Sequence, residues 1–159
     1  MATATSTALG RRTVPAVATI VALILVLAFG NAAFHDWAFK QNSQSAGGLF
    51  WQTLAWPTWR FSTSDSIQNL LADDLKAVLL LVFTYVFVAL LVGSITSKGA
   101  LFLASWSGYI FAGALAGLIA AWLQQHATLY TSLVWAIGGA AYGLIVGWIL
   151  GLVVVVVKR

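Results

Sequence analysis

The stretch that decides the fold is "GGAAYGLIVGWILG", residues 138–151, in which glycine recurs at every fourth position within otherwise apolar sequence. Glycine destabilises a water-exposed helix by about 1 kcal/mol relative to alanine, so a helix with four glycines on one face needs a compensating interaction. In a bilayer, small residues let two helix backbones approach closely, and this packing drives association. The repeat of Gly139, Gly143, Gly147 and Gly151 therefore predicts a transmembrane helix packed tightly against a neighbour.

The composition of the whole chain is that of an integral membrane protein. Of its 159 residues, 61% are hydrophobic and 8% are charged, whereas soluble domains are about half apolar and a quarter charged. The net charge of +4 comes from basic residues at the ends of apolar runs, which is typical of topology signals at lipid headgroups and not of nucleic-acid binding. Cysteine is absent, which excludes disulfides and thiolate chemistry.

Four apolar runs are long enough to cross about 30 Å of hydrocarbon, which takes about 20 helical residues. Within a single membrane domain of residues 1–159, we predict spans over residues 14–34, 75–97, 100–123 and 130–157. Residues 1–13 form a tail, and residues 35–74 form a segment outside the membrane. A cleaved signal peptide is the alternative for the first run, but the run is long for one, so a signal anchor is preferred. The predicted fold class is all-α with four transmembrane helices.

The distribution of charge predicts the orientation in the membrane. With the N-terminus inside, five basic residues fall on the cytoplasmic side: Arg11, Arg12, Lys98, Lys158 and Arg159. All four aspartates and both histidines then fall outside. The inverted topology would violate the positive-inside rule. We therefore expect both termini in the cytoplasm and a multi-pass protein of the plasma membrane, with a bacterial inner membrane suggested by the simple basic flanks.

The third predicted span offers small residues to the glycine face of the fourth. One ridge comprises Gly108, Ala112, Ala116 and Ala120, and Gly113 and Gly117 lie beside it. The connection between the spans is short, so they should form an antiparallel hairpin whose small residues meet. Packing against another copy or another subunit, and a glycine-lined pore, are the alternatives.

The segment between the first two spans is rich in aromatic residues. Its second part, "LFWQTLAWPTWRF" (residues 49–61), supplies the candidate docking residues Trp51, Trp56, Trp59 and Arg60. Tryptophan and arginine dominate binding hot spots, but tryptophan also prefers the membrane interface. A lipid anchor and a docking surface for a partner therefore both remain open. After this segment, Ser64 or Asp65 is expected to cap a helix that continues into the second span.

Residues with chemical potential are few and scattered. His35 beside Asp36, the pair Asp73 and Asp74, and the distant His126 form no recognisable metal-binding or catalytic motif. Lys76, at the start of the second span, is expected to extend its ammonium to the interface. No acidic residue, arginine or histidine lies in the interior of a predicted span, unlike in ion-coupled transporters. We therefore expect no catalytic site, no cofactor and no bound metal.

These features predict a non-catalytic accessory subunit of a larger membrane complex, with the bilayer and other subunits as its partners. The alternative is a homo-oligomeric channel or an uncoupled carrier for a small solute, which should show a polar stripe along a span. Thr84, Ser94 and Thr96 form only an irregular one. A membrane enzyme acting at the outer interface would need His35 and the aspartates to converge in a pocket.

Overall fold

The chain folds into helices alone wherever its structure is described. The computed structural model describes residues 3–59, 66–93, 95–124 and 126–158, with side chains from Thr13 onward. Within these ranges there are six helices and no strand: α1 (Thr3–Phe29), α2 (Ala32–Phe39), α3 (Ala46–Leu54), α4 (Ile67–Val92), α5 (Lys98–Ala121) and α6 (Leu129–Val157). The predicted all-α class is confirmed.

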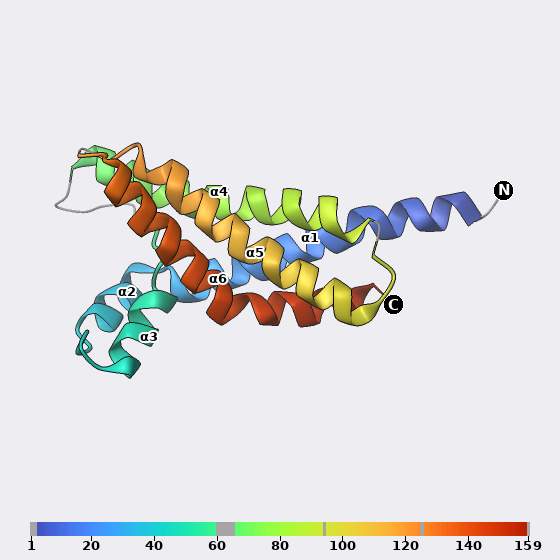
Figure 1. The fold of residues 1–159 in the computed structure, drawn as a ribbon, viewed down its shortest axis with the longest axis horizontal. Helices are drawn as coiled ribbons and strands as arrows, with labels where there is room; N and C mark the ends of the chain where they lie inside the picture. The colour runs from blue at the N-terminus through green and yellow to red at the C-terminus, as the bar shows by residue number, and fades with distance from the viewer. Residues whose placement is uncertain (1–2, 60–65, 94, 125, 159) are drawn as a thin grey trace.

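Four long helices form an antiparallel bundle, and two short helices lie at one end of it (Figure 1). Helix α1 packs on α4 and α6, α4 packs on α5, and α5 makes its most extensive contact with α6. The start of α1 and the end of α6 lie at the same end of the bundle, and α2 and α3 lie at the opposite end. This α2–α3 end carries the candidate functional site.

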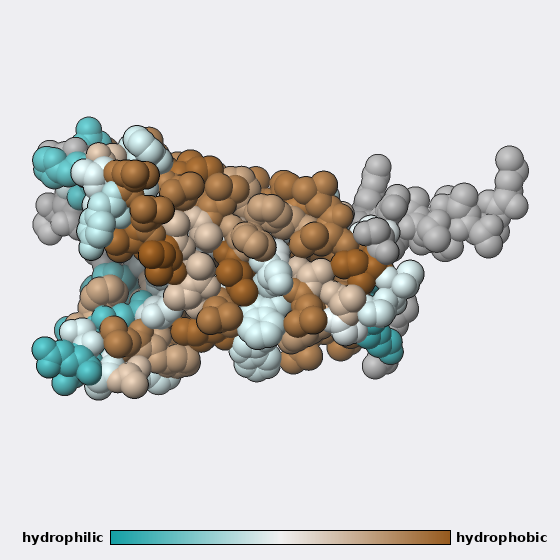
Figure 2. All heavy atoms as spheres, in the orientation of Figure 1, coloured by the Kyte–Doolittle hydropathy of each residue, from teal (hydrophilic) through white to brown (hydrophobic). Residues whose placement is uncertain are grey.

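Three helices, α4, α5 and α6, are each long and apolar enough to span a membrane. A fourth span is present if residues 13–29 of α1 and helix α2 count as one bent element, with 57° between its parts. Hydrophilic residues gather at the ends of the bundle and apolar residues cover its middle (Figure 2). Three or four such helices fit a multi-pass membrane protein.

The first predicted span, 14–34, does not form one continuous helix. Asn31 interrupts it, because its side-chain amide donates to the Ala28 carbonyl (2.8 Å) and its side-chain oxygen accepts from the Phe34 amide (2.9 Å). One side chain thereby provides a hydrogen-bond donor for a backbone carbonyl at the end of α1 and caps the start of α2. The backbone carbonyl of Gly30 accepts a hydrogen bond from the Trp59 amide (3.0 Å), which attaches the later segment to this break.

As predicted, the second span is the continuation of a helix that begins before it. Helix α4 begins at Ile67, eight residues before the predicted span 75–97, and ends at Val92, five residues before the predicted end. Its cap is Ser66, whose hydroxyl accepts from the Asn69 amide (3.3 Å). The caps predicted from sequence, Ser64 and Asp65, lie outside the described residues. Helices α5 and α6 match the spans 100–123 and 130–157 to within two residues.

The bundle interior is filled by side chains from all four long helices. Among the largest fully buried ones are Tyr109, Tyr142, Leu80 and Leu150. The hydroxyl of Tyr109 contacts that of Tyr142 at 3.5 Å, and the Thr84 hydroxyl donates to the Leu80 carbonyl (2.6 Å). The few buried hydroxyls that bond in this way avoid the cost of an unpaired polar group in an apolar interior.

Candidate functional site

Helices α5 and α6 approach each other closely where Gly113 of α5 meets Gly139 of α6. A Cβ atom built on either residue would overlap the backbone carbonyl oxygen of the other. One turn away, a Cβ on Gly117 would overlap the carbonyl oxygen of Trp135, and one on Gly143 would lie 2.7 Å from the Cα of Ile110. Backbone contacts backbone here, so no side chain larger than hydrogen fits without movement.

Further along α6 the nearest atoms to the glycines belong to aromatic rings. A Cβ on Gly147 would lie 2.8 Å from Cδ1 of Trp106, and one on Gly151 would lie 2.9 Å from Cδ2 of Phe102. The Trp106 indole also donates to the Leu144 carbonyl (3.2 Å). The α6 glycine face therefore has two parts, and the backbones approach most closely in the part near the α2–α3 end.

The ridge of α5 that meets these glycines differs from the one expected first. Gly108 faces α4, where a Cβ would lie 3.2 Å from Cδ1 of Leu91. Gly113 and Gly117, expected beside the main ridge, make the contact with α6. Ala112 and Ala116 are buried in the core. Sequence spacing alone could not separate two neighbouring ridges of small residues, because both are compatible with a close helix contact.

The three candidate docking residues that the structure describes do not form one exposed surface. Trp56 is half-buried between helices, with its ring 2.7 Å from a Cβ built on Gly139 and 5.9 Å, centroid to centroid, from Tyr142. Trp59 packs over Gly30, and its indole donates to the Val26 carbonyl (3.3 Å). Arg60 lies outside the described residues. Of the described candidates, only Trp51 lies at the surface.

Trp51 belongs to a group of rings on α2 and α3 that we call the aromatic cluster: Phe34, Trp37, Phe50 and Trp51. Phe34 is partly buried against the core, and the other three are exposed. Their ring centroids lie 5.2–6.4 Å apart in mostly edge-to-face contacts. Trp37, Phe50 and Trp51 remain 44%, 41% and 36% exposed. Trp37 lies outside the aromatic-rich stretch singled out from the sequence, and only the pairing of α2 with α3 brings it to Trp51.

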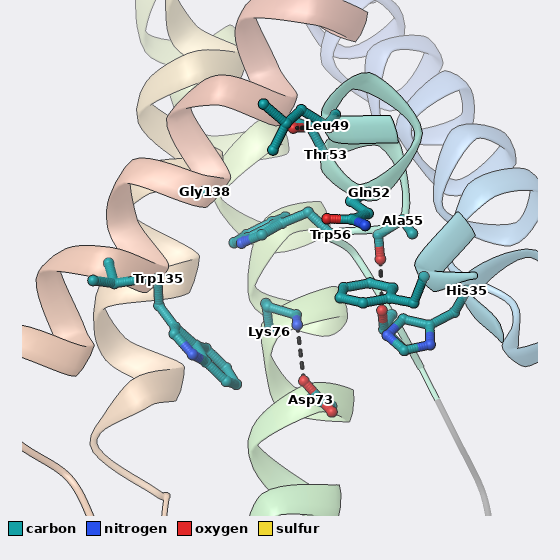
Figure 3. A pocket seen from close by; sticks show the side chains of 13 residues that line it. His35, Leu49, Gln52, Thr53, Ala55, Trp56, Asp73, Lys76, Trp135 and Gly138 are labelled. Atoms are coloured by element: carbon teal, nitrogen blue, oxygen red, sulfur yellow. Dashed lines mark hydrogen bonds and ion pairs between the residues drawn. The ribbon is translucent and has the colours of Figure 1, made fainter. Parts of the chain in front are cut away.

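A cavity of about 510 Å³ opens between the α2–α3 unit and the bundle (Figure 3). Its walls come from α2, α3, the turn after α3, α4 and α6. The lining residues are His35, Phe39, Leu49, Gln52, Thr53, Ala55, Trp56, Thr58, Asp73, Lys76, Val134, Trp135 and Gly138. The volume lies in the range of small-molecule sites, about 300–1,000 Å³.

Lys76 is the buried charge of this cavity. It is 5% exposed, and its ammonium donates to the Asp73 carboxylate at 2.8 Å. The same nitrogen lies 4.5 Å from the ring centre of Trp135 and 5.3 Å from that of Trp56. The expectation that Lys76 extends to the interface is wrong, because a carboxylate and two indole rings offset the desolvation of its ammonium inside the protein.

The sequence contains a signal for this burial. Ala72, Lys76, Leu80, Thr84 and Val88 follow one another at intervals of four, and all are buried. Residues at this spacing share one face of a helix. Lys76 therefore occupies an interior position of α4, and reading this row as a whole would have indicated it.

Replacing Asp73 by asparagine tests the ion pair. We expect a loss of about 1–3 kcal/mol in unfolding free energy, because the buried Lys76 amine would lose the carboxylate that offsets its desolvation. The Asp73 side chain is 28% exposed, so water compensates in part. The measurement is the thermal midpoint in detergent. Asp36→Asn is the control, since that carboxylate is 65% exposed, and equal midpoints for the two variants would contradict the buried pair.

The remaining titratable candidates do not converge on one centre. His35 lines the cavity and stacks on Phe39 at 4.3 Å between centroids, while Asp36 contacts it at 3.4 Å from the exposed side. His126 is exposed and does not line the cavity. Across the described ranges, no group of three or more histidines and acidic residues could hold a metal ion. No protein-family model, curated protein or solved structure matches this chain.

Proposed function

We propose that the protein is a non-catalytic accessory subunit of a larger membrane complex, held in a bacterial plasma membrane by four spans with both termini in the cytoplasm. The observation that carries this proposal is the exposed aromatic cluster on α2 and α3. The partner is an integral membrane subunit that presents an apolar surface at the same end of the bundle. The close packing of α5 and α6 is then the device that keeps the α2–α3 unit at a defined position.

The chemistry of the aromatic cluster suits a protein partner. Trp37, Phe50 and Trp51 hold one another in edge-to-face contacts, so their rings are already ordered before binding. Ordered aromatic side chains lose little conformational entropy on docking, and tryptophan is the residue type most enriched at binding hot spots. Exposed polar residues nearby, including Asp36 and Lys40, would form the rim of such an interface.

The long helices offer a second contact surface. Large apolar side chains are exposed along α4 and α6, including Val82, Leu90, Ile137 and Leu144. Such side chains contact either lipid or the spans of another subunit. Since Tyr109, Tyr142 and Leu80 fill the bundle interior, a channel would have to run between copies, and the experiment below distinguishes that alternative.

Native mass spectrometry after gentle extraction from the protein's own membrane tests the proposal. We expect the chain at fixed stoichiometry with a different, larger membrane protein. The double variant Trp37→Ala, Trp51→Ala should lose that partner while keeping the thermal midpoint of the isolated bundle within a few degrees, because both side chains are exposed.

Trp122→Ala is the matched control. Trp122 is 61% exposed at the end of α5, at the same end of the bundle, and lies outside the aromatic cluster. It should retain the partner. If the control and the double variant behave alike, the rings act as lipid anchors and the docking proposal fails. Recovery of the chain only with copies of itself would favour the homo-oligomeric channel.

A further inference from the structure

The cavity between the α2–α3 unit and the bundle contains one positive and one negative group that neutralise each other. The Lys76 ammonium donates to the Asp73 carboxylate at 2.8 Å, and both residues line the cavity. An anionic ligand would face the carboxylate and a cationic ligand would face the ammonium, so either net charge would meet a like charge in a partly desolvated site. The electrostatics therefore favour an uncharged ligand.

The polar groups of the cavity wall include both donors and acceptors that can bond to a ligand. Within the described residues, the indole N–H groups of Trp56 and Trp135 have no hydrogen-bond acceptor. Gln52 donates to the Gln41 carbonyl over a long 3.4 Å, and its amide has a second N–H and an acceptor oxygen. The Asp73 carboxylate accepts from Lys76 and has about four acceptor positions in all. A ligand that matches this wall must both donate and accept, as a hydroxyl group does.

We propose that this cavity binds the uncharged sugar head group of a glycolipid. A hydroxyl donates and accepts as water does, so the hydroxyls of a sugar ring can replace water at these groups without loss of hydrogen bonds. The C–H groups of the ring can pack on the aromatic side chains Phe39, Trp56 and Trp135, because aromatic faces carry partial negative charge. Trp135 and Gln52 are the donors and Asp73 is the acceptor that we assign to the sugar (Figure 3).

The rim of the cavity favours a sugar carried by a lipid over a free sugar. Leu49 of α3 is 54% exposed and Val134 of α6 is 47% exposed, and both line the cavity. Hydrophilic residues gather at this end of the bundle, where the apolar surface stops (Figure 2). In the proposed membrane orientation, acyl chains would leave the cavity past Leu49 and Val134, and their contact with these side chains would add to the affinity.

The test uses the isolated full-length protein, so it does not depend on the proposed partner complex. Delipidated protein is kept in a polyoxyethylene detergent, whose head group contains no sugar. The probes are monogalactosyl diacylglycerol, diacylglycerol and phosphatidylglycerol with the same acyl chains, and soluble methyl galactoside. Native mass spectrometry over a concentration series gives the bound lipid, and the thermal midpoint is recorded. We expect the galactolipid to bind most tightly, at fixed stoichiometry, and to raise the midpoint.

Each of the other probes can overturn one part of the proposal. Diacylglycerol binding as tightly as the galactolipid would show that the sugar is not recognised. Phosphatidylglycerol binding as tightly would show that the site does not select an uncharged head group. Protection by methyl galactoside equal to that by the galactolipid would overturn the assignment to a lipid.

Trp135→Phe should weaken galactolipid binding about threefold to tenfold, because phenylalanine keeps a ring beside the Lys76 ammonium but has no N–H. Trp148→Phe is the matched control, since Trp148 lies on the same helix, is 46% exposed and does not line the cavity. It should bind the galactolipid as the unmodified protein does. Equal affinities of the two variants would overturn the role of Trp135.

Gln52→Leu covers the case in which Trp135→Phe does not fold. Leucine is similar in size but neither donates nor accepts, so galactolipid binding should weaken about fivefold or more. The midpoint without lipid should change little, because the bond that is lost to the Gln41 carbonyl is long. Gln68→Leu, at an exposed glutamine of α4 outside the cavity, should leave binding unchanged. Binding by Gln52→Leu as tight as by Gln68→Leu would overturn the proposal.

Discussion

Replacing Gly139 by leucine is expected to lower the unfolding free energy by about 3 kcal/mol or more, because a branched side chain must enter a contact where even a methyl group overlaps backbone. A Cβ on Gly139 would overlap the carbonyl oxygen of Gly113. Backbone atoms on two packed helices cannot move aside as a flexible side chain can. For a chain of this size, that loss corresponds to a fall in thermal midpoint of about 6–12 °C.

The structure predicts a graded series along the same face. Gly139→Ala should already destabilise the protein. Gly147→Ala should destabilise it less, because its neighbours are the ring edges of Trp106 and Tyr109, and side chains can shift more readily than backbone. Gly99→Ala is the control, since nothing lies within 4 Å of a Cβ at Gly99, and alanine favours the helix. Thermal midpoints measured in detergent rank the variants by stability. Equal effects at Gly139 and Gly99 would contradict the backbone contact.

Trp56→Ala is expected to destabilise the protein by about 2–4 kcal/mol, close to the cost of removing a core tryptophan. Its ring lies against Gly138 and Gly139, stacks on Tyr142 and covers the ammonium of Lys76. Truncation would open a void between α5 and α6 and would uncover a buried charge. Both consequences weaken the junction between the α2–α3 unit and the bundle.

Trp51→Ala separates this effect from a general loss of aromatic surface. Trp51 is 36% exposed and contacts only rings of the aromatic cluster among the described aromatic pairs. Its removal should lower the unfolding free energy by about 1 kcal/mol or less. Thermal unfolding of the two single variants in one detergent is the measurement. Greater destabilisation by Trp51→Ala than by Trp56→Ala would contradict the assignment of Trp56 to the interior.

The comparison of these two tryptophans shows the limit of sequence reasoning about the candidate site. Both lie in one aromatic stretch, and composition predicts the same interfacial role for each. The turn after α3 directs Trp56 toward α6 and leaves Trp51 on α3, beside Trp37 of α2. Which rings face inward depends on the angle at which the short helices meet the bundle, and local sequence does not encode that angle.

Lys76 illustrates the same limit for charge. At the end of an apolar run, a lysine is ordinarily expected to reach the interface. Here the i, i+4 row from Ala72 to Val88 turns it inward, and Trp135 arrives from a helix more than fifty residues later in the chain. The row was visible in the sequence, whereas the indole rings that make burial tolerable were not.

Sequence by itself determined that the chain is helical, that its long helices are apolar enough to span a membrane and where three of them lie. It also determined that α6 carries a face of glycines, because length, hydropathy and spacing are local properties. Tertiary structure alone decided that the first span breaks at Asn31 and that Gly113, and not Gly108, packs against α6. It also decided that Trp56 points into the protein and that a cavity forms around Lys76. Each of these depends on contacts between residues far apart in the chain, whose geometry is set by how whole helices pack and not by any single segment.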